Sequence, residues 1–306
     1  MAPPPSAKRC TVAIIGLGNI GGVAAGCLRA ADRHEIVVCV RQPIQRLYLE
    51  RPEGDVEVSL RALTEPAEAS PVDWVLLCTK AQQTPSAAPW LARLCDSSTR
   101  IAVLQNGISH VERVAPLSGG AVVVPTLVYY NGERLGADRV RLRHVSEHAL
   151  VATDDADGRA FAQLLEGTPL RVLLSGEFST LAWRKLLVNA VANPITALTL
   201  QRQAVLRRED IKALCIAILD EAVAVACADG AQLAEDEAHK TLANLMTYPP
   251  EAGTSMYFDR LAGRELEVEA LTGAIVAAGD RLHIATPLNS TLLTLLRAIS
   301  DAASSG

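Results

Sequence analysis

The sequence predicts two domains, an α/β domain over residues 8–174 and an all-α domain over residues 175–306. In the first part, short apolar runs rich in β-branched residues alternate with helical stretches, and from Ser179 onward the pattern is helical almost throughout. A chain of 306 residues is long enough for two domains, and its apolar fraction of 49% suffices for two cores. Alternating strands and helices are typical of a mostly parallel sheet.

The first apolar run, Thr11–Ile15, leads into a glycine-rich loop and then into a helical stretch of small residues, Val23–Ala31. The loop has the pattern Gly-x-Gly-x-x-Gly of a Rossmann-type, dinucleotide-binding domain. There the first glycine permits a tight turn, the second lets the backbone approach a pyrophosphate, and the third lets the helix pack on its strand. The expected cofactor-binding residues are Gly16, Leu17, Gly18, Asn19, Ile20 and Gly21. The alternative is a tight turn that binds no nucleotide.

A second expected strand, Glu35–Arg41, ends in an arginine. NAD-binding domains usually have an acidic residue at this place, which accepts a hydrogen bond from the ribose 2′-hydroxyl. A guanidinium suits a 2′-phosphate instead, so Arg41 predicts NADPH rather than NADH as the cofactor. Arg46 is either a second phosphate contact or a solvated surface charge.

Two further strands are expected to deliver polar side chains to the same edge of the sheet. Val72–Thr79 is followed by Lys80, and Arg100–Leu104 is followed closely by Asn106. Ligands of open α/β sheets bind at the carboxyl ends of the strands. Lys80 is therefore a candidate cofactor contact, although a lysine in a surface loop would look the same. Asn106 either orients the nicotinamide or the substrate, or simply forms a turn with the glycine that follows it.

The remaining elements follow the same patterns. Later strands are expected near Ala121–Val128, Val140–Val145, His148–Thr153 and Leu170–Leu174, and breaks in the helical part are expected at Thr247–Gly253 and near Thr286–Pro287.

A lysine and two asparagines recur at four-residue intervals in an otherwise apolar stretch: Lys185, Asn189 and Asn193. At 3.6 residues per turn they share one side of a helix. A buried amine or amide needs a partner, because leaving it unpaired costs about 1–3 kcal/mol. An oxygen-rich ligand would supply those partners, which predicts an active site between the two domains. The alternative is a polar helix edge that meets solvent.

Glu267 is expected in a helix from about Ser255 to Gly279. The residues that share its face are Ala270, Leu271, Ala274 and Ile275. A carboxylate on an apolar face is seldom buried without a partner, and Lys185 is the best cation for it. The alternative is a partly exposed side chain where the domains meet.

At this point the chain resembles the ketopantoate reductases (2-dehydropantoate 2-reductases). The matching motifs keep that family's order over nearly the whole chain: Gly-Leu-Gly-Asn-Ile-Gly at 16–21, Cys-Thr-Lys at 78–80, Gln-Asn-Gly at 105–107, Lys-x3-Asn-x3-Asn-Pro at 185–194, Thr-Ser-Met at 254–256, Gly-Arg-x-x-Glu at 263–267 and Thr-Pro-Leu-Asn at 286–289.

The resemblance implies NADPH-dependent reduction of a 2-keto acid, 2-dehydropantoate to pantoate, in pantothenate and coenzyme A biosynthesis. It implies that Lys185 protonates or polarises the reacting carbonyl and that Glu267 helps to hold the substrate and to tune that lysine. The positions implied to bind the keto acid or shape its pocket are Asn106, Asn189, Asn193 and Ser255. Arg41 and Lys80 fall on the phosphate side of NADPH.

Two other functions remain open. A 3-hydroxyacid or 6-phosphogluconate-type dehydrogenase also pairs a Rossmann-type domain with a helical one and carries a Lys-x3-Asn element, but the second asparagine, Ser255 and Glu267 favour the ketopantoate type. An NADP-sensing regulator without turnover would have no reason to keep Lys185 and Glu267 on apolar faces. Resemblance to a family predicts the fold of a protein better than it predicts the substrate.

Composition excludes several classes of partner. A net charge of −5 with scattered basic residues disfavours a nucleic-acid surface, and no run of about 18 to 20 apolar residues could span a membrane. The seven cysteines form no Cys-x-x-Cys pair, and Met1–Lys8 lacks the apolar core of a signal peptide, so a cytoplasmic location with reduced thiols is expected. His144 and His148 lack a ligand cluster, so no metal is expected. The sequence leaves the oligomeric state open, with a homodimer as one alternative.

Overall fold

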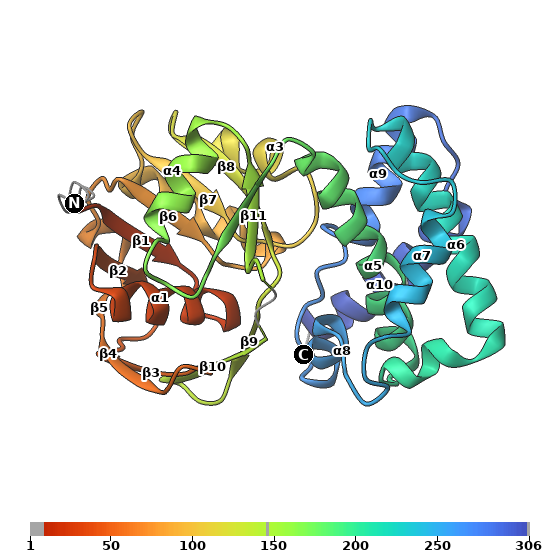
Figure 1. The fold of residues 1–306 in the computed structure, drawn as a ribbon, viewed down its shortest axis with the longest axis horizontal. Coiled ribbons are helices and arrows are strands. Elements are labelled where there is room, and N and C mark those ends of the chain that lie inside the picture. The colour runs from red at the N-terminus through yellow and green to blue at the C-terminus, as the bar shows by residue number, and fades with distance from the viewer. Residues whose placement is uncertain (1–8, 145–146, 305–306) are drawn as a thin grey trace, which may run out of the picture. The chain divides into compact units, whose positions relative to one another are not determined.

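The computed structural model describes residues 9–144 and 147–304 of the chain (Figure 1). The chain divides into two compact units between Gly176 and Glu177, and each unit is described by itself below. The expected tail Met1–Lys8 lies outside the described residues, and so does Val145, the last residue of one expected strand.

Unit 1 is built on an eight-stranded sheet with the strand order β12-β11-β8-β7-β6-β1-β2-β5. The strands are β1 (Thr11–Ile15), β2 (Glu35–Cys39), β5 (Arg61–Leu63), β6 (Trp74–Leu77), β7 (Arg100–Val103), β8 (Val122–Val128), β11 (Leu150–Thr153) and β12 (Val172–Ser175). All neighbouring strands are parallel except β8 and β11. The carboxyl ends of β1, β2, β6 and β7 therefore lie at one edge of the sheet.

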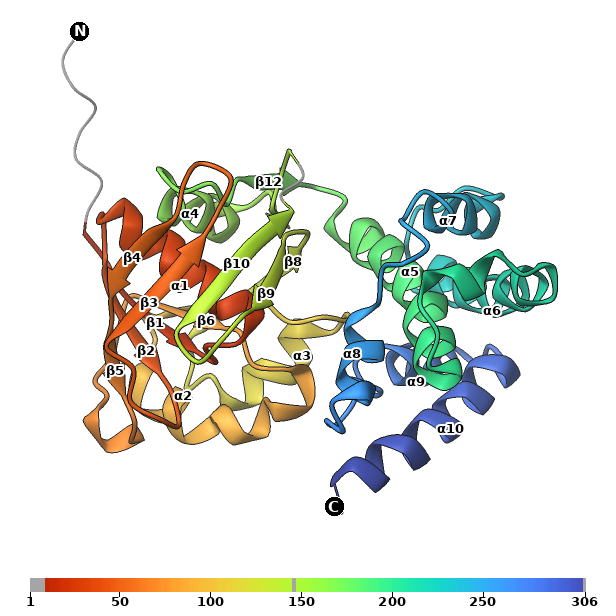
Figure 2. The same cartoon turned by 90° about the horizontal axis from the view of Figure 1, so that it is seen from below.

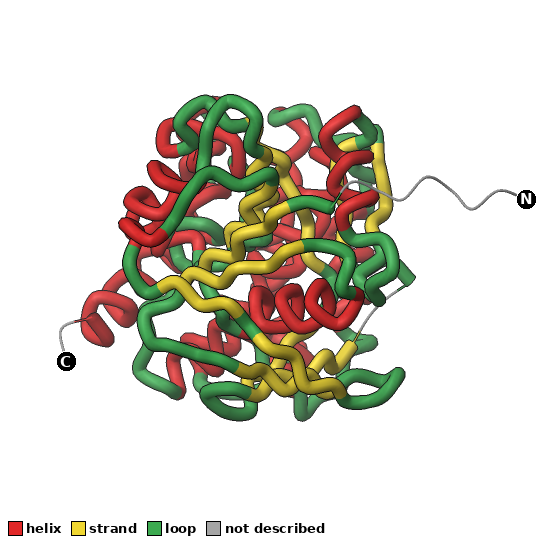
Figure 3. The backbone as a smooth tube through the Cα atoms, turned by 90° about the vertical axis from the view of Figure 1, so that its left-hand side faces the viewer, coloured by secondary structure: helices red, strands yellow, loops and turns green. Residues whose placement is uncertain are grey.

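Both faces of this sheet are buried, which explains why its strands read as continuous apolar runs. The helices of this unit are α1 (Asn19–Ala31), α2 (Ala88–Leu94), α3 (His110–Val114) and α4 (Ala156–Leu164). Val12 and Ile14 of β1 belong to a core that includes residues of α1 and α4, whereas Ala13 and Ile15 belong to a second core with Leu91 of α2. Figure 3 shows the twisted sheet with helices on either side.

A second, four-stranded sheet with the order β4-β3-β10-β9 was not predicted from the sequence. Its strands are β3 (Arg46–Glu50), β4 (Val56–Ser59), β9 (Asn131–Arg134) and β10 (Arg139–His144). The expected strand at Val140–Val145 corresponds to β10, which belongs to this second sheet. These strands are short and have charged residues on one face. They therefore contain too few apolar positions for the sequence pattern to predict which strands pair with each other.

The second sheet covers helix α1 on the side away from the main sheet (Figure 1). A methyl group added to Gly26 would lie 3.0 Å from the side chain of Leu49 on β3, and one added to Gly22 would lie 3.5 Å from Val140 on β10. Small residues in α1 therefore allow the helix to be buried between two sheets. Eight consecutive residues of α1, from Gly21 to Leu28, are buried.

Unit 2 is helical (Figure 2). Its helices are α5 (Phe178–Thr199), α6 (Glu209–Ala228), α7 (Glu237–Leu245), α8 (Ser255–Leu261), α9 (Thr272–Leu282) and α10 (Pro287–Ser304). Helix α5 contacts α6, α7, α8 and α10, and is buried over much of its length. Both expected breaks are present, between α7 and α8 and between α9 and α10. Within the described residues, none of the helices combines the length and apolarity needed to cross a membrane.

The prediction of one continuous helix from about Ser255 to Gly279 was wrong. Helix α8 ends at Leu261, helix α9 begins at Thr272, and Glu267 lies in the irregular segment between them. Gly263 explains the break: it has φ +61°, and the amide of Arg264 turns back to donate to the carbonyl of Asp259 at 2.8 Å. A glycine in the left-handed region is a common way to end a helix.

Candidate functional site

The three glycines of the loop after β1 have three different environments. Gly16 has φ +93°, and a Cβ there would lie 2.8 Å from the amide nitrogen of Thr79. A Cβ on Gly21 would lie 2.0 Å from the carbonyl oxygen of Gly16. A Cβ on Gly18, by contrast, would meet no atom of the described residues within 4 Å. Gly16 and Gly21 are thus required by the fold, whereas Gly18 leaves open space at the start of α1.

That open space has the character of an anion site. Gly18 is the N-cap of α1, no side chain caps the helix, and its first turn, which is described in full, contains no acidic residue. The first amides of a helix lack partners within the helix and favour negative charge. Leu17 is buried, while Gly18 and Asn19 are exposed and Ile20 is half-buried. These residues fit the pyrophosphate of a dinucleotide.

Strand β9 of the second sheet supports this loop, a role that sequence reasoning missed. The guanidinium of Arg134 donates to the carbonyl of Leu17, and its backbone amide donates to the side chain of Asn19 at 3.1 Å. The Tyr130 hydroxyl, just before β9, donates to the carbonyl of Ile20 at 2.8 Å. No sequence motif marks these contacts, because they join segments more than 100 residues apart.

The two arginines near the end of β2 have different surroundings. Arg41 is exposed two residues beyond the carboxyl end of β2, next to the strand that carries the glycine-rich loop. Arg46 begins β3 and pairs with Glu57 across the second sheet at 3.0 Å, with its side chain 68% exposed. This pairing agrees with the interpretation of Arg46 as a solvated surface charge rather than as a second phosphate contact.

Lys80 and Asn106 follow neighbouring parallel strands, β6 and β7. Both are half-buried, Lys80 as the residue before a 3₁₀ turn and Asn106 just before Gly107, which has φ +92°. The chain bends at Asn106 and Gly107, and this bend lies at the same sheet edge as the glycine-rich loop.

In unit 2, Lys185 and Glu267 interact electrostatically. Lys185 lies on α5, and removal of its ammonium group from water lowers its pKa to about 8, while the negative charge of Glu267 acts in the opposite direction. Glu267 is 7% exposed, which argues against the alternative of a partly exposed side chain. The helical-face argument for Glu267 was wrong, but the residue is buried and near enough to influence Lys185.

Three of the four residues implied to bind substrate also lie in unit 2: Asn189, Asn193 and Ser255. Asn193, 3% exposed, donates to the side-chain oxygen of Asn189 at 3.2 Å, one turn earlier on α5. One turn after Asn193, the hydroxyl of Thr196 lies 2.7 Å from that of Thr254, which caps α8. These bonds fix the start of α8, where Ser255 is exposed.

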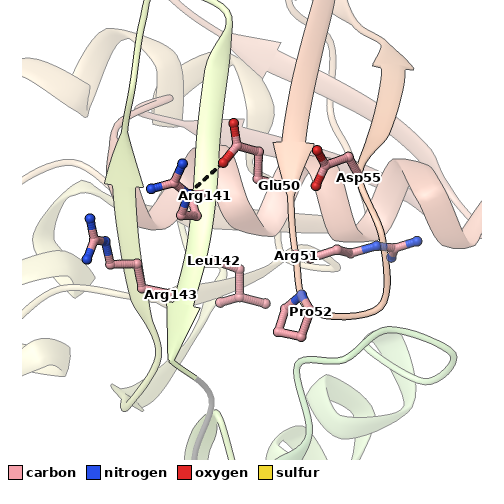
Figure 4. Close-up of a pocket in the computed structure, with 7 residues that line it drawn as sticks. All are labelled: Glu50, Arg51, Pro52, Asp55, Arg141, Leu142 and Arg143. Atoms are coloured by element: carbon pink, nitrogen blue, oxygen red, sulfur yellow. Dashed lines mark hydrogen bonds and ion pairs between the residues drawn. The ribbon is translucent and has the colours of Figure 1, made fainter.

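A charged pocket of about 360 Å³ lies elsewhere, on the second sheet (Figure 4). Its lining residues are Glu50, Arg51, Pro52, Asp55, Arg141, Leu142 and Arg143. Glu50 pairs with Arg141 at 2.6 Å and with Arg139 at 2.9 Å, and these hydrogen bonds hold the pKa of its carboxyl below the usual value. The pocket contains none of the expected site residues, and its charges are largely paired within the sheet.

The glycine-rich loop at the carboxyl edge of a mostly parallel sheet gives unit 1 the Rossmann-like fold typical of dinucleotide-binding domains, and unit 2 follows it as a helical domain. Residues 12–153 match the family described as "Ketopantoate reductase PanE/ApbA", and residues 177–300 match "Ketopantoate reductase PanE/ApbA C terminal". The chain belongs to the ketopantoate reductase family.

Relatives of known sequence or structure span nearly the same length. A 2-dehydropantoate 2-reductase of Mycobacterium tuberculosis is 39% identical over 292 residues, covering 95% of this chain and 98% of that protein. A solved ketopantoate reductase of Ralstonia eutropha JMP134 has a TM-score of 0.86 and 29% identity, covering 96% and 99%. A dimeric ketopantoate reductase of Staphylococcus aureus has a TM-score of 0.85 and 27% identity, with the same coverage.

The glycine environments predict opposite effects for two similar substitutions. Gly21→Ala should lower the melting temperature, because overpacking against a backbone oxygen costs about 1–3 kcal/mol. Gly18→Ala should leave the melting temperature nearly unchanged and weaken dinucleotide binding, since its methyl group would occupy the open space. Thermal unfolding and a fluorescence titration with NADPH measure both effects. Unchanged NADPH affinity in Gly18→Ala would contradict the assignment of this space to the cofactor.

Proposed function

We propose that this chain catalyses the NADPH-dependent reduction of 2-dehydropantoate to pantoate. Membership of the ketopantoate reductase family and the name of the M. tuberculosis relative support this substrate. The observation that carries the proposal is the arrangement of Lys185 one turn before the hydrogen-bonded pair of Asn189 and Asn193 on α5, with the buried Glu267 acting on the lysine, because it combines a proton donor with groups that suit a keto acid.

The cofactor would be held by unit 1. The amides at the start of α1 and the open space at Gly18 fit its pyrophosphate, Arg41 suits the 2′-phosphate, and Lys80 and Asn106 lie along the same edge. When bound, NADPH supplies the hydride that reduces the C2 carbonyl.

Lys185 would donate a proton to the carbonyl oxygen of the substrate as negative charge builds there. A positioned general acid of this kind typically contributes about 10²- to 10⁴-fold. Glu267 holds the lysine in its charged form, since its negative charge opposes the effect of burial on the Lys185 pKa. Asn189, Asn193 and Ser255 offer uncharged hydrogen-bonding groups for the carboxylate and hydroxyl of the keto acid, as does Asn106.

We also propose a homodimer as the assembly. The related enzyme of S. aureus is described as dimeric, and it matches this chain over 96% of its length.

A panel of 2-keto acids, assayed by NADPH oxidation, tests the proposed reaction. The unmutated protein should reduce 2-dehydropantoate with the highest kcat/KM of the panel, and Lys185→Ala should lower kcat by about a hundredfold or more with NADPH affinity retained. Preferred oxidation of 3-hydroxyacids, measured in a parallel assay by the reduction of NADP⁺, would favour the alternative dehydrogenase. NADPH binding without turnover of any compound would favour the NADP-sensing regulator.

The cofactor preference should depend on Arg41. Replacing it by Gln removes a charge-assisted contact to the 2′-phosphate, so the ratio of kcat/KM for NADPH to that for NADH should fall by about tenfold or more. Arg46→Gln is the matched control and should leave the ratio unchanged, because Arg46 pairs with Glu57. Equal kcat/KM values for the two cofactors in the unmutated protein would overturn the assignment of Arg41.

The pH dependence should report Lys185. A general acid acts in its protonated form, so kcat/KM for the keto acid should fall as pH rises through about 8. Glu267→Gln removes the charge that raises the Lys185 pKa, and this decline should therefore begin at lower pH. Glu265→Gln changes an exposed carboxylate two residues away and should leave the profile in place. A decline that stays in place, or moves to higher pH, in Glu267→Gln would refute the coupling.

A further inference from the structure

Gln105 is a buried polar residue to which the proposed reaction gives no role. It lies just after β7 and directly before Asn106, and it is 3% exposed. Its Nε2 lies 3.2 Å from the hydroxyl of Thr79 and 3.0 Å from that of Thr84, and its Oε1 lies 3.2 Å from Nε of Arg113. Both ends of the side-chain amide are therefore engaged by other parts of unit 1.

The partners fix the orientation of this amide. Arg113 can only donate, so the oxygen of Gln105 must face it and the nitrogen must face the two threonines. The hydroxyl of Thr84 can donate to the carbonyl of Ala81 at 2.8 Å or to Oε1 of Gln105 at 3.2 Å, and in either case its oxygen can accept from Nε2 of Gln105. A flipped amide would set a donor against a donor at Arg113.

The same residue is also fixed through its backbone. Its carbonyl oxygen lies 3.1 Å from Nε2 of His110, the first residue of α3, and because a carbonyl only accepts, the proton sits on that nitrogen. Arg113, which bonds the Gln105 side chain, also donates to the carbonyl of Ile108 at 3.1 Å. The loop that carries Asn106 is thus held from both sides.

The two threonines flank Lys80. Thr79 precedes it, and Thr84 follows the 3₁₀ turn that begins after it, at Ala81–Gln83. Thr79 also packs on the glycine-rich loop, since a Cβ on Gly16 would lie 2.8 Å from its amide nitrogen and 3.0 Å from its methyl group. Through one side chain, Gln105 joins the loop of Asn106 to the segment of Lys80, and Thr79 continues the connection to Gly16.

We propose that Gln105 is a positioning residue that holds the segment of Lys80 and the loop of Asn106 at the separation that a complete dinucleotide requires. This inference rests on the proposed function. Lys80 would meet the phosphate side of the cofactor and Asn106 its nicotinamide side, so a ligand that reaches both depends on their separation. A fragment that carries only the phosphate side does not depend on it.

Binding of two probes separates this role from a general structural one. In Gln105→Met, which keeps the length of the side chain but removes its donors and acceptor, the Kd for NADPH should rise by roughly five- to tenfold. The Kd for adenosine 2′,5′-bisphosphate, which lacks the nicotinamide half, should change by less than about twofold. Isothermal titration calorimetry measures both, and melting curves confirm that each variant is folded.

Matched variants sharpen the test. Gln83→Met replaces an exposed glutamine of the same segment and should leave both affinities unchanged. Thr84→Val removes the hydroxyl that accepts one of these hydrogen bonds from Gln105. It should therefore also weaken the binding of NADPH more than that of adenosine 2′,5′-bisphosphate. This variant keeps the proposal testable if Gln105→Met fails to fold.

Equal losses for the two probes, or no loss for either, would overturn the role of Gln105 while leaving the proposed function intact. If the unmutated protein bound neither probe, the proposed function would fail, and this inference would fail with it.

Discussion

The shielding of the Lys185 ammonium group from water is the constraint on which the chemistry proposed for the helical unit depends. Burial lowers its pKa to about 8, and the charge of Glu267 keeps it from falling further. A lysine in water would hold its proton too firmly to act as an efficient acid near neutral pH, and a buried lysine without a carboxylate nearby would lose its charge. The charge of Glu267 and the burial of Lys185 together place the pKa of this lysine between these limits. The packing of α5 and the irregular segment between α8 and α9 both serve to hold that pair.

Unit 1 meets a different constraint, the close packing of backbone segments around the glycine-rich loop. The turn at Gly16 and the contact at Gly21 bring the start of α1 to the sheet edge, and the second sheet covers the helix from its other side. Close packing against the second sheet requires small residues at the points of contact, which explains Gly22 and Gly26 in α1. Gln105 then joins the neighbouring loops of the same edge through hydrogen bonds that span 21 to 26 residues of sequence.

The sequence predicted what depends on local pattern. The glycine-rich loop, the parallel strands around it and the helical second part follow from periodicity and from glycine chemistry, and the order of the motifs identified the family. The second sheet, the support of the loop by Arg134 and the network around Gln105 depend on pairings between distant segments, which periodicity does not encode. The break at Gly263 was overlooked because the apolar pattern on either side of it continues in a helical period. Glu267 was thus expected to be buried for a reason that the structure does not support.

A crystal structure of the protein with NADP⁺ and pantoate would test the central claim most directly. The distance to measure is that from Nζ of Lys185 to the C2 hydroxyl oxygen of pantoate. If Lys185 is the proton donor, this distance should lie within hydrogen-bond reach, roughly 2.6–3.2 Å, in a complex whose pyrophosphate lies against Gly18. A pantoate hydroxyl that bonds another acid while Lys185 points away from it would contradict the account.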